Sequence, residues 1–284
     1  MPFIVEGLGL DEPVLVALIP EHEGWVRDAL GTDAKEVGFV DISRLGANPA
    51  RIIPAWQKFL DASSGRQRPA RGVGEPIWPG RRPDELLECQ LHEALLNVAI
   101  EPESPSWIVC PYDATHLAPE VIEEAYRSHP VILEADTYSG SASYRGRDHV
   151  DSLIAGDLGG LDGTPRATEF DRENVNRLLA YVKLELYVAG LAANQAAELA
   201  AAVEGLALSS LRRGATHGDV RIWRLPDAVV CEVADDIEVS DLLWGRRVPS
   251  AGNHDDLWRV NQLCDLVQMR STPAGTTVRV HTWL

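Results

Sequence analysis

Apolar and polar positions alternate along residues 11–136 in a pattern typical of short strands separated by amphipathic helices. Runs rich in apolar residues predict five strands, over residues 12–19, 36–42, 70–77, 107–113 and 130–136. The stretches between these runs place apolar residues at helical spacing, and Asn48-Pro49 and Ala118-Pro119 are typical helix starts. Such alternation predicts an α/β domain over residues 1–140, with a mostly parallel sheet covered by helices.

The pattern changes at Thr137. Residues 137–172 are rich in Gly, Ser and Asp, and we expect a linker over residues 141–172. Beyond it the periodicity predicts helices near 173–190 and 194–213, strands over 219–225 and 228–235, a helix from Leu257 and a strand over 276–284, with Gly214 ending the second helix. Helices leading into an antiparallel sheet predict a second, α+β domain over residues 173–284.

Charge and hydropathy narrow the class of protein. A net charge of -17 without a basic stripe lacks the electrostatic footprint of a nucleic-acid-binding surface, so we expect no direct nucleic-acid partner. No apolar run approaches the length of a membrane span, and no signal peptide opens the chain. These features predict a cytoplasmic protein without a membrane partner.

Cysteine and histidine spacing does not predict a metal site. The four cysteines are widely scattered without a C-x-x-C pair, which favours reduced thiols over disulfides or zinc ligands. The histidines show no H-x-x-x-H or H-x-x-E spacing. We therefore expect no bound metal. The residues concerned are Cys89, Cys110, Cys231 and Cys264, with His116, His129, His254 and His281.

Glycines in residues 71–81, RGVGEPIWPGR, suggest a phosphate-binding loop. The stretch lacks the G-K-[ST] ending that would supply a lysine and a magnesium-binding hydroxyl. The simpler interpretation is that Gly72 and Gly74 allow a turn and that Pro76 ends strand pairing. Alternatively, Glu75 lies at the carboxyl end of a strand, where open α/β sheets bind their ligands.

Five further side chains are candidates for lining one cleft. His92 and Glu93 lie in a predicted helix, and Cys110, Tyr112 and Asp113 lie at the end of a predicted strand. A Cys–His–Asp hydrolase would need a base and an orienting acid beside the thiol. No nucleophile-elbow turn surrounds Cys110, so a buried, inert thiol is favoured. The two remaining interpretations are a small-molecule pocket and plain packing.

The C-terminal half carries a motif pattern of its own. Residues 173–284, with SSLRRG, CEVAD and NHDDLWRVNQLCDL, resemble the histidine-kinase-like (GHKL) ATPase domain of bacterial anti-sigma-factor serine kinases. The resemblance implies an N-box glutamate base, a magnesium-binding asparagine four residues later, an adenine-binding acid followed by a glycine, and a glycine-rich phosphate loop. It also implies phosphoryl transfer to an antagonist protein and binding of a sigma factor.

The residues at those positions depart from the family pattern. Gly205 stands at the base position and Ser209 at the magnesium position. Asp235 matches the adenine-binding acid, but Ile237 replaces the glycine after it. His254 and Asp256 replace phosphate-loop glycines, and Asp255 and Asp256 form a capped helix start in the simpler interpretation. Carboxylates beside a polyphosphate repel it, so we expect no catalytic residues, no firmly bound cofactor and at most weak ATP binding through Asp235 and Ser209.

The N-terminal half resembles the MEDS domain, a sensory module of methanogen and methylotroph regulators. The resemblance rests on residues 48–56, 71–81, 88–97 and 110–130. It implies a fold related to P-loop proteins that have lost the loop, and an opening strand with a His-x-Ala-Leu motif that this chain lacks. A MEDS domain followed by a GHKL domain is the layout of actinobacterial RsbA-type anti-sigma regulatory proteins.

The combined resemblance leaves three functional hypotheses. The first is a signalling protein that senses a ligand or a partner and acts by binding a sigma factor or an anti-sigma antagonist, with a kinase-like domain that does not catalyse. The second is an active ATP-dependent serine kinase. The third is a small-molecule sensor whose GHKL domain serves as a dimerisation platform, because such domains commonly form homodimers.

Overall fold

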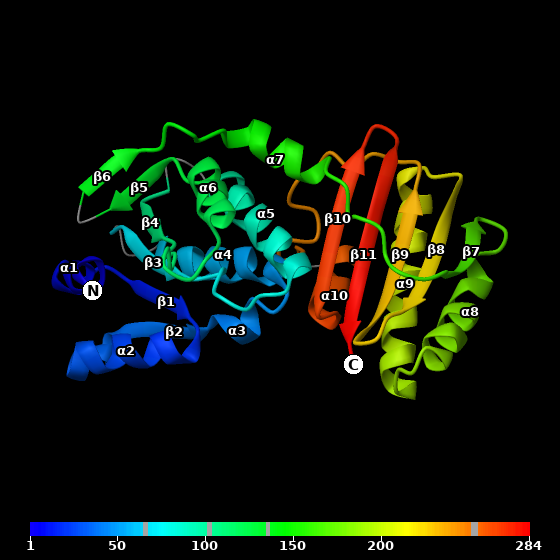
Figure 1. Ribbon diagram of the computed structural model, residues 1–284, viewed down its shortest axis with the longest axis horizontal. Coiled ribbons are helices and arrows are strands. Elements are labelled where there is room, and N and C mark those ends of the chain that lie inside the picture. The colour runs from blue at the N-terminus through cyan, green and yellow to red at the C-terminus, as the bar shows by residue number, and fades with distance from the viewer. Residues whose placement is uncertain (65–67, 101–103, 135–136, 251–254) are drawn as a thin grey trace. The chain divides into compact units, whose positions relative to one another are not determined.

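The predicted alternation of strands and helices is present in the computed structural model, which describes residues 1–64, 68–100, 104–134, 137–250 and 255–284. The chain divides into two units, Met1–Val150 and Asp151–Leu284 (Figure 1). Among the described residues, no helix has both the length and the apolar character needed to cross a membrane.

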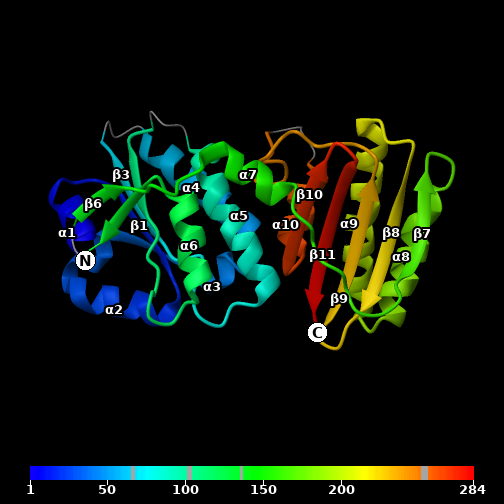
Figure 2. The ribbon, with the colours of Figure 1, turned by 45° about the horizontal axis from the view of Figure 1, so that its top comes forward.

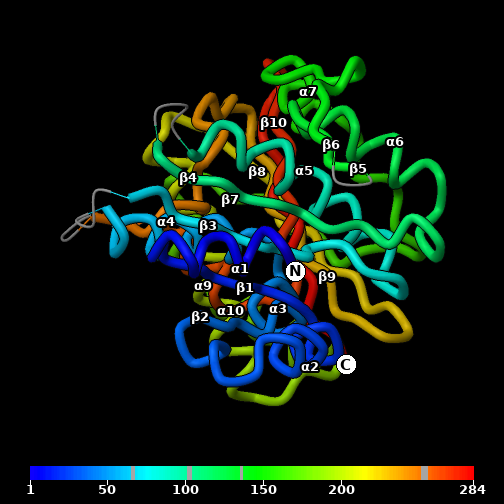
Figure 3. The backbone as a smooth tube through the Cα atoms, turned by 90° about the vertical axis from the view of Figure 1, so that its left-hand side faces the viewer, coloured from blue at the N-terminus to red at the C-terminus, as the bar shows by residue number. Residues whose placement is uncertain are grey.

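A four-stranded parallel sheet forms the centre of the first unit. Its strands are β1 (Val14–Leu18), β2 (Val37–Asp41), β3 (Ala70–Gly74) and β4 (Ser106–Val109), in the order β2-β1-β3-β4 (Figure 3). The helices are α1 (Pro2–Gly9), α2 (Pro20–Leu30), α3 (Ile42–Leu45), α4 (Ile52–Ser63), α5 (Pro83–Ala99) and α6 (Pro119–Ser128), with short 3-10 turns η1 (Gly31–Glu36) and η2 (Pro49–Arg51). The predicted α/β class and parallel sheet are confirmed.

Both predicted helix starts are confirmed. The Asn48 side chain accepts a hydrogen bond from the Ala50 backbone N–H (3.1 Å) and so caps η2, which leads directly into α4. Pro119 occupies the first turn of α6, where its missing N–H leaves no intrahelical hydrogen bond unmade.

The fifth predicted strand does not join the parallel sheet. β5 (Val131–Glu134) pairs antiparallel with β6 (Thr137–Gly140), and residues 135 and 136 lie outside the described residues. Three of the four β5 residues are exposed. The apolar run alone does not distinguish a surface hairpin from a core strand, and a partner strand adjacent in sequence pairs with little loop-closure entropy.

The predicted linker over residues 141–172 contains regular structure and needs correction. Helix α7 (Gly146–Ile154) and strand β7 (Arg166–Asp171) lie within it, and β7 pairs with the second unit's sheet. The high Gly, Ser and Asp content conceals three fully buried apolar residues, Val150, Ile154 and Phe170. Burial of these few side chains outweighs the coil-forming composition around them.

The second unit is an antiparallel sheet with helices packed against one face (Figure 2). The strand order is β10-β11-β9-β8-β7. The remaining elements are α8 (Val175–Val188), α9 (Ala193–Arg213), β8 (His217–Arg224), β9 (Ala228–Asp235), α10 (Asp256–Leu263), β10 (Leu266–Thr272) and β11 (Gly275–Trp283). The predicted α+β class is confirmed, and α9 ends at Gly214, whose φ is +114°. The sequence pattern missed β10, which lies directly after a helix with only two residues between them.

Gly72 and Gly74 lie inside β3 and do not form the turn that the sequence suggested. The Trp56 ring of α4 packs against this part of the strand, and a Cβ added at Gly72 would lie 2.7 Å from a ring carbon. On the other face of the sheet, Val14 and Val16 pack with Ile4 of α1. The glycines therefore serve the close approach of α4 to the sheet rather than a phosphate.

Gly72→Ala is expected to lower the free energy of unfolding of the first unit by about 1–3 kcal/mol, because the added methyl group overpacks the Trp56 contact. Urea unfolding followed by hydrogen exchange and mass spectrometry measures this with peptides from β1 and β3. Gly24→Ala is the matched control: Gly24 lies in α2 with open space around its Cα, and the variant is expected to gain about 0.5–1 kcal/mol. Equal effects at the two positions would contradict the packing role of Gly72.

Candidate functional site

A cavity of about 850 Å³ lies in the first unit, along β4, which is an edge strand of the parallel sheet. It is bounded by α5, by β4 and the segment after it, by α6 and by the β5–β6 hairpin. Most lining side chains are apolar, including Trp107, Ile108, Ile122 and Ile132. The polar lining side chains include several tyrosines and the pair Glu93 and His129. This combination of apolar walls and a few convergent polar groups is typical of a small-molecule site.

Glu93 and His129 form an ion pair in the wall of the cavity. Glu93, on α5, is only 2% exposed, and its Oε2 lies 2.9 Å from Nε2 of His129, the residue that ends α6. The other ring nitrogen, Nδ1, lies 2.8 Å from the Ala125 carbonyl oxygen. A carbonyl oxygen only accepts, so Nδ1 carries a proton and the ring orientation is fixed.

Both ring nitrogens of His129 face acceptors, so the ring is an imidazolium and Glu93 a carboxylate. Burial lowers the pKa of His129, but hydrogen bonding and attraction to Glu93 more than offset this and hold the pKa above its usual value. Conversely, burial raises the pKa of Glu93, and the contact with His129 more than offsets this, so that pKa lies below its usual value. The pair is therefore charged inside an otherwise apolar wall.

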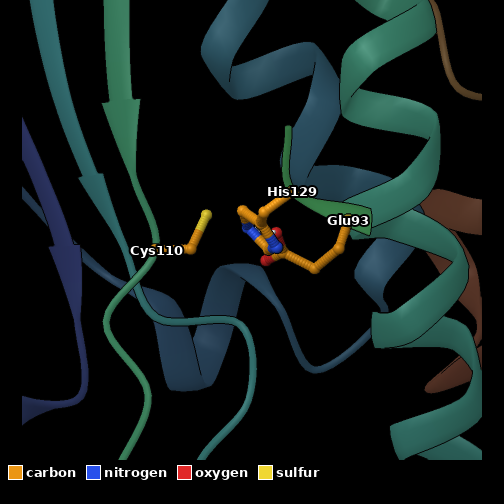
Figure 4. A group of neighbouring side chains, drawn as sticks. All are labelled: Glu93, Cys110 and His129. Carbon is orange, nitrogen blue, oxygen red and sulfur yellow. Dashed lines mark ion pairs between the residues drawn. The ribbon is translucent and has the colours of Figure 1, made fainter. Parts of the chain in front are cut away.

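Cys110 and Tyr112 complete the polar wall. Figure 4 shows the Cys110 side chain directed from the segment after β4 toward His129 and Glu93. Burial, together with the negative charge of Glu93, raises the pKa of Cys110 well above its usual value. Burial also raises the pKa of Tyr112, whose ring meets the His129 ring edge-on at 5.7 Å. The thiol is thus protonated, and the nearest histidine is already paired with a carboxylate.

This arrangement predicts that the Cys110 thiol reacts slowly with alkylating reagents. Alkylation of Cys110 by iodoacetamide in the native protein is expected to be about 10-fold or more slower than in the urea-unfolded chain, because little thiolate is present at neutral pH. Peptide mass spectrometry measures the rate, and the fully buried Cys89 serves as an internal reference for access. Alkylation of Cys110 faster than in the unfolded chain would revive the nucleophile hypothesis.

The six residues suggested by the sequence do not share one cleft. Glu93, Cys110 and Tyr112 line the cavity. His92 is fully buried within α5 and is not among the lining residues. Asp113 hydrogen-bonds His116 on the surface (2.7 Å). Glu75 lies after β3, where its carboxylate contacts His22 (2.8 Å) and the Ile19 N–H (3.4 Å).

The sequence pattern did not assign His129 to the site. Its neighbours Glu93 and Cys110 are 36 and 19 residues away in the chain, so no local spacing connects them. The available signal was positional: a histidine that ends a helix just before an apolar run, in an α/β pattern. That signal places a side chain near a sheet edge but does not select its partners.

The residues suggested for nucleotide binding are connected to one another by Arg213. Its guanidinium donates to Ser209 Oγ (3.0 Å) and to Asp235 Oδ2 (2.8 Å), and it stacks over the Trp244 ring at 4.5 Å. The other Asp235 oxygen accepts from the Ile237 N–H (2.9 Å). The Asp235 side chain is 4% exposed. Both of its oxygens are thus already satisfied within the chain.

The carboxylates at the start of α10 also have partners within the chain. Asp255 caps the helix by accepting from the Trp258 N–H (3.0 Å), as the simpler interpretation predicted. Asp256 forms an ion pair with Arg212 of α9. A Cβ at Gly205 would lie 3.1 Å from an oxygen of Asp256, so this carboxylate occupies the space beside the position of the missing base. His254 lies outside the described residues.

The parallel sheet and the cavity beside its edge strand β4 define the first unit as an α/β domain with a ligand-sized site. Residues 1–130 match the family model of the MEDS domain, the MEthanogen/methylotroph, DcmR Sensory domain. This part of the chain is therefore a MEDS domain, as the sequence resemblance predicted, and a sensory domain indicates a role in signalling. No curated protein matches the chain.

Proposed function

We propose that the protein is a signalling regulator in which the MEDS domain senses a ligand and the second unit acts by binding a protein. The partner is a sigma factor or an anti-sigma antagonist, and the second unit is a GHKL-type domain without kinase activity. The observation that carries the proposal is the 850 Å³ cavity, whose charged pair, Glu93 and His129, lies within residues 1–130, the range that matches a sensory family.

The contacts of Arg213 favour protein binding over phosphoryl transfer. ATP would have to displace Arg213 from Asp235 before the carboxylate could accept a hydrogen bond from the adenine amino group. Ser209 and Gly205 supply neither the magnesium ligand nor the base, and two aspartates at the start of α10 repel phosphates. Each of these features opposes a different step of the kinase reaction.

Calorimetric titration of ATP into the full chain, with and without magnesium, tests the loss of kinase function. We expect at most weak, magnesium-independent binding in the wild type, and stronger binding in Arg213→Ala, which frees Asp235. Combining Gly205→Glu with Ser209→Asn should not restore phosphorylation of an antagonist, because the new carboxylate meets Asp256. Magnesium-dependent micromolar binding by the wild type, with phosphorylation of an antagonist, would replace this proposal by the kinase hypothesis.

Binding of purified sigma factors and anti-sigma antagonists from the source organism tests the partner. Biolayer interferometry with the immobilised full chain should detect one specific complex. Capture of none of them, together with a stable homodimer by sedimentation, would favour the sensor with a dimerisation platform.

A further inference from the structure

Three side chains with metal-binding atoms converge in the wall of the cavity. Glu93 comes from α5, Cys110 from the segment after β4, and His129 from the end of α6 (Figure 4). One carboxylate oxygen, the thiol sulfur and one ring nitrogen all lie within 4.8 Å of one another. Three rigidly placed elements therefore hold three different ligand types around one point.

The groups that contact the three candidate ligands also suit a metal site. Metal-binding histidines commonly donate the other ring N–H to a carbonyl or carboxylate, which fixes the tautomer and directs the free nitrogen at the metal. His129 has this arrangement, because Nδ1 donates to the Ala125 carbonyl and Nε2 faces Glu93 and Cys110. Glu93 is almost fully buried, and within the described part of the chain its second carboxylate oxygen, Oε1, has no hydrogen-bond partner.

We propose that Glu93, Cys110 and His129 bind a zinc ion, with a fourth coordination position open to the cavity. Thiolate, imidazole and carboxylate are the protein ligands of zinc, and three of them plus an exchangeable fourth is the pattern of sites that bind a small ligand at the metal. Tetrahedral bonds of about 2.0–2.3 Å place ligand atoms about 3.3–3.8 Å apart. Side-chain shifts of about 1 Å therefore close the cluster on the ion.

The charge balance supports the same occupant. Without metal, the site holds a neutral thiol and a neutral ion pair. With Zn²⁺, it holds a thiolate, a carboxylate and a neutral imidazole, so the net charge is again zero. Binding one Zn²⁺ releases two protons, one from the Cys110 thiol and one from Nε2 of the imidazolium. A site buried in an apolar wall gains from this neutrality in both states.

Cobalt substitution in the full-length protein tests the site. We expect one Co²⁺ per chain, with a thiolate-to-cobalt charge-transfer band in the near ultraviolet that Zn²⁺ removes by competition. Cys110→Ser should abolish the band, and Cys110→Ser and His129→Gln should each weaken Zn²⁺ binding by at least about 10-fold. The matched controls, Cys89→Ser and His116→Gln, should keep the wild-type band and affinity. Co²⁺ binding without the band, or binding that survives in both Cys110→Ser and His129→Gln, would overturn the proposal.

The wild-type protein offers a test that no folding defect of a variant can obscure. Calorimetric titration of Zn²⁺ in buffers of different ionisation enthalpy measures the protons released. Release of close to two protons per zinc is expected, and release of none would contradict the proposed ligands.

A role of this metal in sensing rests on the proposed function. The experiments can reject the zinc site and the proposed function independently of each other. Zinc binding that leaves partner capture unchanged would uphold the site and reject its part in sensing. Partner capture that responds to an organic ligand, in a protein without the cobalt band, would reject the zinc site and keep the sensory role.

Discussion

Arg279→Met is expected to destabilise the second unit by about 3–5 kcal/mol, because it removes the closest partner of a buried carboxylate and leaves Arg221 Nη1 3.9 Å from Glu232 Oε2. Arg279, in the middle of β11, is 5% exposed, and its Nε donates to Glu232 Oε1 on the neighbouring strand β9 (2.7 Å). Its two terminal nitrogens donate to the carbonyl oxygens of Leu158 and Gly159 (2.8 Å each). Methionine fills the space of the stem but satisfies none of these three acceptors.

Urea unfolding with hydrogen exchange and mass spectrometry measures the effect on peptides from β9 and β11. Arg247→Met is the matched control in the same unit: Arg247 and Asp241 are both more than half exposed and 3.3 Å apart, so a loss below about 1 kcal/mol is expected. Peptides covering residues 155–160 should also exchange faster in Arg279→Met alone. A loss of the same size as in the control would show that the pair contributes little.

Arg71→Met is expected to cost about 3 kcal/mol in the first unit. The Arg71 side chain is 9% exposed, and it donates to Glu12 Oε2 (2.5 Å), Glu6 Oε2 (2.9 Å) and the Phe3 carbonyl oxygen (2.8 Å). Burial lowers the pKa of Arg71, and the two carboxylates more than offset this and raise it. Glu12 is as buried as Arg71, whereas Glu6 can be hydrated, so the expected loss is at the lower end for a buried pair.

The same measurement, on peptides from α1 and β3, tests this loss. Arg68→Met is the control, because Arg68 and Asp11 form an ion pair of 2.5 Å in which both side chains are largely exposed. We expect the control to lose less than about 1 kcal/mol. Arg71→Met should also increase exchange in α1, since Arg71 is the residue that connects Phe3 and Glu6 of α1 to the sheet. Unchanged exchange in α1 would contradict that role.

The candidate site was only partly predictable from the sequence. The alternation of strands and helices placed Cys110 and Tyr112 at the end of a strand of a parallel sheet, where ligands commonly bind, and the structure has them in the cavity wall. It also placed His92 and Glu93 on one helix but did not specify which of two adjacent residues faces the cavity. Consecutive helical residues point about 100° apart, so only packing decides between them.

The residues suggested for ATP binding were also only partly predictable from the sequence. The identities of Gly205, Ser209 and Ile237 are sufficient to predict a poor ATP site. They do not predict that Arg213 connects Ser209 to Asp235, because the packing of α9 against β9 is what brings positions 209 and 235 together. A long, flexible side chain selects its partner only after both elements are in place.

The local sequence determined most of the secondary structure. Apolar periodicity, proline and asparagine at helix starts and Gly214 after α9 act through neighbours within a few residues, so the sequence alone predicts them. The tertiary structure decided that Trp56 packs against glycines of β3 and that Glu93, Cys110 and His129 meet. These outcomes depend on contacts between residues far apart in the chain, whose energies exist only when the sheet has brought them together.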